Sequence, residues 1–119
     1  MLKIDAKNSG RAVVLGLEGR IVSGETDILH NSMDSLRETS EIILDLARVT
    51  MVDAHGLGVM LKLRERAQEK GIRFELMNVS ERLSRVLQIT RLDTVFEIIP
   101  RVEFFPPVSH YVGQRMAAA

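Results

Sequence analysis

The sequence predicts an α/β fold in which helices pack against a mixed β-sheet. Two observations predict it. Short apolar stretches with strand periodicity alternate with longer segments of helical periodicity, and together they follow the order β-β-α-β-α-β-α. Helices that follow strands favour parallel pairing through right-handed crossovers, and functional groups then gather at the C-terminal ends of the strands. The 119 residues suffice for one domain with one hydrophobic core.

Four segments carry the apolar pattern of strands. Apolar and polar residues alternate in residues 2–6, whereas residues 12–17 are all apolar or glycine. The turn signal at residues 8–10 between them predicts an antiparallel hairpin. The apolar run at residues 42–46 predicts a buried central strand, and residues 74–77 predict a fourth strand.

Three segments predict helices. In residues 23–40 a single apolar stripe is expected, with Ser23 or Thr26 as the N-cap. The stripe consists of Ile28, Leu29, Met33 and Leu36. Residues 54–70 present a broader apolar face, and residues 83–90 form the stripe of a short third helix.

A loop over residues 47–53 is expected to lead from the central strand into the second helix. It ends in the junction 53–58, with the sequence Asp-Ala-His-Gly-Leu-Gly. Asp45 and Asp53 flank this loop and are candidates for paired acids. A single carboxylate within an apolar strand more often bonds to backbone or to arginine, so no catalytic pair is predicted.

The motifs of metal and cofactor chemistry are missing from the sequence. The histidines His30, His55 and His110 are not spaced to place two ligands on one helical face. There is no phosphate-binding loop and no nucleophile elbow, and the glycine pair of residues 56–58 is too short for a dinucleotide fingerprint. We therefore expect a protein that is not an enzyme and has neither a metal nor a cofactor.

Charge and composition narrow the class of partner. Sixteen basic residues balance sixteen acidic ones, so no net field attracts nucleic acid. The N-terminus lacks the features of a signal peptide, and the apolar runs are far shorter than the roughly 20 residues of a membrane-spanning helix. We expect a cytoplasmic protein without direct membrane insertion. Residues 1–99 form the predicted domain, and residues 100–119 form a C-terminal tail that is partly ordered or mobile.

Several blocks of the sequence resemble a known family. Residues 42–46 and 49–61 resemble the core of the STAS family, the family of the anti-sigma-factor antagonists. Residues 74–80 and 86–98 resemble its last strand and C-terminal helix, so the resemblance covers roughly residues 2–99. It implies a mixed four- to five-stranded sheet with helices packed mainly on one face. It also implies a protein partner, an anti-sigma factor that is also a serine kinase. When a member of this family binds the anti-sigma factor, the sigma factor is released. Phosphorylation of the family member reverses this binding.

The junction departs from the family pattern at the phosphorylated position. Regulated members carry Asp-Ser-Ser-Gly or Asp-Ser/Thr-x-Gly, whereas this sequence has Asp53, Ala54, His55 and Gly56. Neither Ala54 nor His55 has a hydroxyl group, so the usual serine phosphorylation is not expected here. Thr50 is the nearby alternative acceptor, although a threonine at this place suits a hydrogen bond to backbone equally well. His55 is either a surface polar residue or a partner contact.

The resemblance places a partner-binding surface at the junction and at the loop before the first helix. Its predicted residues are Ser23, Thr50, Asp53, Ala54, His55, Gly56 and Leu57. Two other functions stay open: a STAS subunit of an ABC-type phospholipid transport assembly, and a binder of a small anionic ligand at the helix N-terminus. The oligomeric state is also open, with a homodimer among the options.

Overall fold

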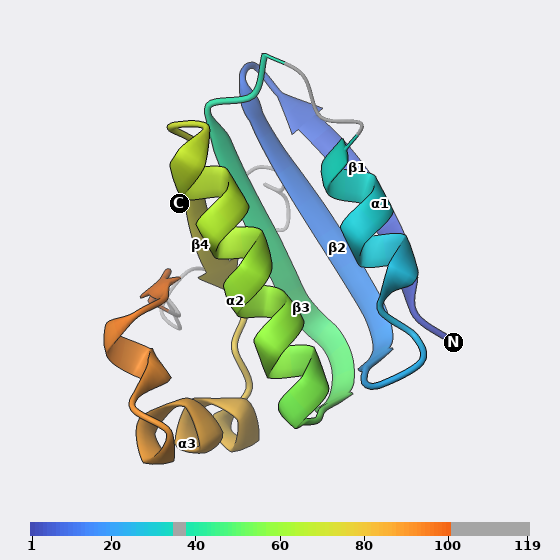
Figure 1. The fold of residues 1–119 in the computed structure, drawn as a ribbon, viewed down its shortest axis with the longest axis vertical. Helices are drawn as coiled ribbons and strands as arrows, with labels where there is room; N and C mark the ends of the chain where they lie inside the picture. The colour runs from blue at the N-terminus through green and yellow to red at the C-terminus, as the bar shows by residue number, and fades with distance from the viewer. Residues whose placement is uncertain (35–37, 101–119) are drawn as a thin grey trace, which may run out of the picture.

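The computed structural model describes residues 1–34 and 38–100. Within them, strands and helices follow one another in the predicted order, which is confirmed (Figure 1). Their bounds are β1 Lys3–Ser9, β2 Ala12–Ile21, α1 Asp27–Asp34, β3 Glu41–Val52, α2 Ala54–Glu69, β4 Arg73–Met77, α3 Glu81–Ile89, the 3₁₀ helix η1 Leu92–Thr94 and β5 Glu97–Ile98. The tail predicted over residues 100–119 lies outside the described residues, apart from Pro100.

The strands form one mixed sheet in the order β1-β2-β3-β4-β5. β1 and β2 pair antiparallel as the predicted hairpin, and β2, β3, β4 and β5 pair parallel. The register aligns Leu15, Leu44 and Leu76 in one row across the three central strands. The predicted mixed sheet is therefore confirmed, with five strands in the described residues.

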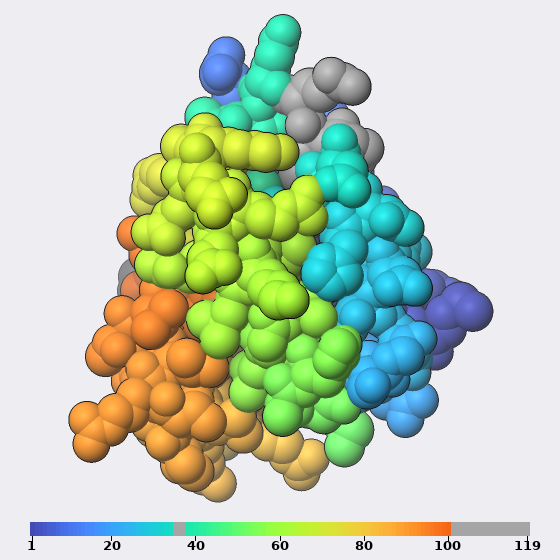
Figure 2. Space-filling model, in the orientation of Figure 1, coloured from blue at the N-terminus to red at the C-terminus, as the bar shows by residue number. Residues whose placement is uncertain are grey.

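Helices α1 and α2 lie side by side over one face of the sheet, and α3 lies at the end where β3 leads into α2 (Figure 1). Leu15, Leu44 and Leu76 are all 0% exposed beneath these helices, because alternate residues of a strand point to the same face. Arg66 of α2 and Asp34 of α1 form an ion pair on the outer surface. The side chains of the helices close over this face of the sheet (Figure 2), so the core lies between the sheet and the helices.

The prediction of a loop over residues 47–53 is wrong, because β3 continues as a strand to Val52. The pairing between β2 and β3 is interrupted by two register shifts in this stretch. Near them, consecutive residues are both exposed, first Ala47 with Arg48 and then Thr50 with Met51. Such β-bulges interrupt the period of two, so the pattern no longer indicates a strand.

The first helix and the second strand also differ in length from the sequence prediction. β2 continues past residue 17 to Ile21, which is fully buried although Glu18 and Arg20 before it are exposed. α1 begins after Thr26, whose backbone carbonyl accepts hydrogen bonds from the first turn of the helix. In the predicted stripe, Leu29 and Met33 are buried, Ile28 is 44% exposed, and Leu36 lies outside the described residues.

Candidate functional site

Asp53 joins the start of α2 to the loop between β2 and α1. Its Oδ1 accepts a hydrogen bond from the backbone N–H of Gly56 at 2.8 Å, so Asp53 is the N-cap of α2. Its Oδ2 accepts from the backbone N–H of Ser23 at 3.1 Å, thirty residues earlier in the chain. These two bonds, first that of Gly56 and then that of Ser23, hold the pKa of Asp53 below its usual range. One carboxylate therefore fixes two loops against each other.

Gly56 allows α2 to start against the end of β2. A Cβ atom at Gly56 would lie 1.9 Å from the carbonyl oxygen of Ile21, which no side chain can tolerate. The same carbonyl accepts the backbone N–H of Asp53 at 3.3 Å. The first turn of α2 therefore contacts β2 through backbone atoms, and a residue without a side chain is required at this position.

His55 makes a second link between the two loops. Its Nε2 lies 3.4 Å from Oγ1 of Thr26, the residue that precedes α1. Thr26 is 5% exposed, whereas His55 is exposed. The imidazole thus stands on the surface with one edge against a buried hydroxyl group. Thr26 was not predicted as a site residue, because no local sequence pattern relates two residues so far apart in the chain.

The other predicted site residues divide into exposed and buried ones. Ser23 and Ala54 are exposed next to the Asp53 cap. Thr50 is also exposed, and its hydroxyl group donates to the carbonyl oxygen of Gly19 at 3.3 Å, the backbone bond considered from the sequence. Leu57 is only 9% exposed and belongs to the hydrophobic core. The exposed surface at this end of the molecule therefore includes Ser23, Thr50, Ala54 and His55, and Asp53 holds its two loops together.

Asp45 has its own hydrogen-bond partners on the sheet. Its Oδ1 accepts from the backbone N–H of Ala47 at 3.1 Å and from the side-chain amide of Asn78 at 2.9 Å. The first bond lies within β3, the second ties β3 to the residue after β4, and Asp53 takes no part in either. In the described ranges, no group of three His, Cys, Asp or Glu side chains could hold a metal ion. No helix among those residues is long and apolar enough to cross a membrane.

The mixed sheet, the two helices on one of its faces and the exposed helix start after the central strand define an α/β domain with a loop surface as its candidate site. Residues 3–105 match the STAS domain family. The chain therefore belongs to the STAS domain family.

Relatives of known sequence and structure share this fold. The anti-sigma-B factor antagonist of Bacillus subtilis (strain 168) is 26% identical over 103 residues, which cover 86% of this chain and 94% of that protein. An anti-sigma factor antagonist from Mycobacterium paratuberculosis aligns with a TM-score of 0.74 at 17% identity, covering 87% of this chain and 89% of that one. The anti-sigma factor antagonist SpoIIAA in its unphosphorylated form aligns with a TM-score of 0.65 at 18% identity, covering 85% and 91%. The likeness spans nearly the whole of each relative.

Proposed function

We propose that this chain is a protein-binding regulator of the anti-sigma-factor antagonist type, and that it docks its partner at the start of α2 and the loop before α1. The observation that carries the proposal is the double hydrogen bond of Asp53, which turns two separate loops into one rigid surface. A surface that is fixed before binding loses little conformational entropy when a partner docks. The relative from Bacillus subtilis, named as an antagonist of an anti-sigma factor, supports the class of partner.

The partner is a protein of the anti-sigma-factor class with serine kinase activity, and the chain acts as its ligand in the cytoplasm and not as an enzyme. The exposed residues of the surface supply no nucleophile and base in hydrogen-bond contact. On this surface the imidazole of His55 contacts the hydroxyl group of Thr26, which is buried, and Glu25 of the loop before α1 pairs with Arg20. Such a surface suits recognition of a partner better than catalysis.

The chain binds this partner without the phosphorylation switch of its family. A phosphate adds about −1.5 to −2 charges and weakens an interface that fits a neutral side chain. At the two exposed positions between the cap and Gly56, this chain has Ala54 and His55, neither of which carries a hydroxyl group. Thr50 has one, but that hydroxyl group donates to the backbone of Gly19. Binding is therefore constitutive with respect to a serine kinase.

A charge substitution tests the surface. His55→Glu places a fixed negative charge where regulated relatives carry phosphate, and we expect affinity for the purified anti-sigma factor to fall at least about tenfold. Gln68→Glu adds the same charge near the other end of α2, at another exposed position, and should leave affinity within about twofold. Isothermal titration calorimetry measures both affinities, and circular dichroism verifies that both variants are folded. Equal affinities for wild type and His55→Glu would show that the partner binds elsewhere.

Phosphorylation and partner class are tested separately. After incubation with each serine-kinase-type anti-sigma factor of the source genome and ATP, the intact mass should stay unchanged. A stoichiometric gain of one phosphate would contradict the constitutive proposal. In a pull-down from the native organism, recovery of an ABC ATPase without an anti-sigma factor would replace the proposed partner by a transport assembly.

A further inference from the structure

A groove lies beside the candidate site, where β3 is longer than its neighbour β4. The pairing of β3 with β4 ends at Asp45 and Met77, but β3 continues to Val52. Among the described residues no strand pairs with this extension on the β4 side, and α3 lies there instead. A hollow of about 140 Å³ remains between the strand and the helix.

The lining of this groove is mainly apolar. Its apolar side chains come from both elements: Leu46, Val49, Met51, Val52, Leu83 and Val86. Met51 is 55% exposed, so its side chain is accessible at the mouth of the groove. The volume is close to that of a cavity that binds benzene, about 150 Å³. The groove therefore has room for one side chain of the size of leucine or phenylalanine.

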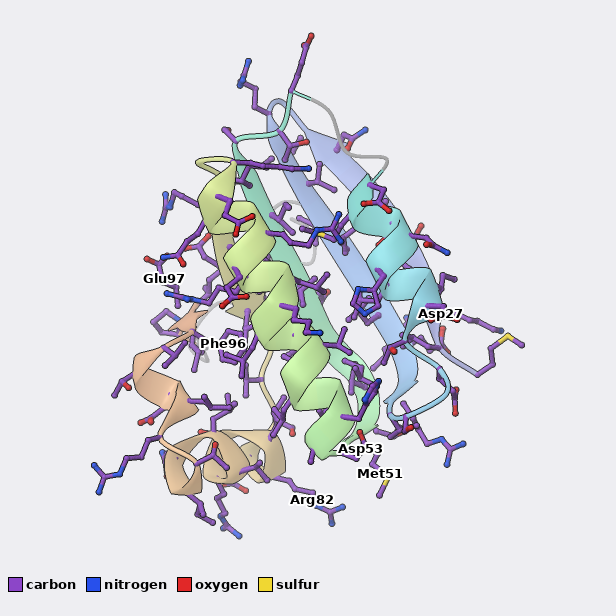
Figure 3. All side chains as sticks on the ribbon, in the orientation of Figure 1. Asp27, Met51, Asp53, Arg82, Phe96 and Glu97 are labelled. Atoms are coloured by element: carbon purple, nitrogen blue, oxygen red, sulfur yellow. The ribbon has the colours of Figure 1, made fainter. Side chains whose placement is uncertain are left out.

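An unpaired cation lies at the rim of the groove. Arg82, in the first turn of α3, lines the groove and is exposed. Its guanidinium group forms no ion pair or hydrogen bond with the residues that the structure describes. Met51, Asp53 and Arg82 all lie at the same end of the molecule (Figure 3), and Thr50, one of the exposed residues of the candidate site, also lines the groove. A free guanidinium group beside an apolar hollow is complementary to a carboxylate next to an apolar side chain.

We infer that this groove is a second docking point for the protein partner: it takes one leucine- or phenylalanine-sized side chain from a partner segment that places a carboxylate against Arg82. This inference rests on the proposed function, because it assigns the partner a second contact beside the first. Apolar anchors buried in a pocket contribute most of the affinity of many interfaces, and flanking charges orient the partner.

The first test uses two short synthetic peptides that share a central phenylalanine, flanked by glutamates in one and by lysines in the other. The full chain is labelled at its six methionine methyl groups and followed by NMR. The glutamate peptide should shift the Met51 signal in a saturable manner, and the lysine peptide should bind at least about tenfold more weakly. Equal binding of both peptides, or no shift of Met51, overturns the inference.

A pair of matched variants tests whether Arg82 is the cation that binds the carboxylate of the peptide. Arg82→Glu should weaken the glutamate peptide at least about tenfold. Arg85→Glu makes the same change on an exposed residue of the same helix that does not line the groove, and should change affinity by less than about threefold. A loss of equal size in both variants would mean that the general field of α3 attracts the peptide, and the inference would be wrong.

The second test uses the purified anti-sigma factor. Met51→Asp should weaken its binding at least about tenfold, whereas Ile89→Asp, at a position that is 81% exposed and outside the groove, should not. If the factor responds to His55→Glu but not to Met51→Asp or Arg82→Glu, the proposed function stands and the groove inference fails. If no anti-sigma factor binds the wild type, the proposed function itself fails.

The groove could instead be filled by a second copy of the chain or by its own C-terminal segment, and the NMR signal of Met51 in the free, full-length chain distinguishes these two cases. A dependence of the Met51 signal on protein concentration would indicate a second copy of the chain. A shift of that signal in the double variant Phe104→Ala with Phe105→Ala would indicate the chain's own C-terminal segment. Either outcome contradicts a groove that is open to the partner.

Discussion

Two glycines at the start of α2 have opposite local environments. Gly56 faces the backbone of β2, with the Ile21 carbonyl oxygen 1.9 Å from the place of a Cβ atom, whereas a Cβ atom at Gly58 would meet nothing within 4 Å. Sequence alone presents both as members of one Gly-Leu-Gly motif. The structure therefore assigns the requirement for glycine to the first of them.

Alanine at each position tests this difference. Gly56→Ala should lower the free energy of unfolding by about 1–3 kcal/mol or more, because the start of α2 must move away from β2. Gly58→Ala should raise it by about 0.5–1 kcal/mol, because alanine loses less backbone entropy in a helix. Chemical denaturation measures both values. A Gly56→Ala variant as stable as the wild type would show that the close backbone contact does not exist.

Only part of the candidate site was predictable from the sequence at the scale of single residues. The junction at Asp53 was predictable because a cap residue, a glycine and an apolar run stand next to each other in the chain. The hydrogen bond between Ser23 and Asp53 and the contact between Thr26 and His55 were not predictable, because each joins residues about thirty positions apart. Only the fold brings those residues together.

The strand β4 carries a titratable group on the face of the sheet opposite the helices. A hydrogen bond with Glu41, burial and the charges of Glu41 and Glu97 raise the pKa of Glu75 to about 7, and the charge of Arg73 offsets part of this effect. Nη2 of Arg73 lies 3.0 Å from Oε2 of Glu75, and the side chain of Glu75 is only 13% exposed. The folded protein therefore holds a proton on this group that the unfolded chain releases near its ordinary value of 4.5.

This arrangement predicts a dependence of stability on pH. A folded-state pKa above the unfolded value means that the folded state binds more protons between pH 4.5 and about 7, so the free energy of unfolding falls as pH rises through this window. Glu75→Gln should flatten the dependence and raise the melting temperature at pH 8. Glu69→Gln, on an exposed position of α2, serves as the control and should follow the wild type. A wild-type stability that stays constant from pH 4.5 to pH 7.5 would exclude the raised pKa.

At the scale of elements, sequence patterns identified the three α-helices and four of the five strands of the described residues, but they missed η1 and β5 and failed where β3 bulges. The first half of β3 alternates regularly, and residues 42–46 were sufficient to recognise it. In the second half, two pairs of exposed neighbours remove the alternation, so a strand was mistaken for a loop. The groove was not predictable either, because it depends on β3 extending further than β4 and on the position of α3.

The whole molecule depends on one core that runs under the helices across the sheet. Leu44 lies at its centre, fully buried and aligned with Leu15 and Leu76 on the neighbouring strands. The order of elements and the apolar runs were enough to predict this core, since burial of alternate residues follows from strand geometry. Truncation at its centre should therefore affect the stability of the entire domain.

Leu44→Ala should lower the free energy of unfolding by about 2–5 kcal/mol, because it removes buried atoms and leaves a cavity. Arg48→Ala, an exposed position of the same strand, should change it by no more than about 0.5 kcal/mol. Urea denaturation followed by circular dichroism measures both. Similar stabilities of the two variants would mean that the core is centred elsewhere.

The arrangement around the N-cap separates what builds the loop from what it displays. Asp53 and Gly56 hold the loop in place, while Ala54 between them is exposed. An exposed residue inside a fixed frame is free to change in evolution without refolding the domain. For the partner surface proposed above, a substitution at Ala54 or His55 changes the side chain that the surface displays, while the hydrogen bonds of Asp53 keep the shape of the loop.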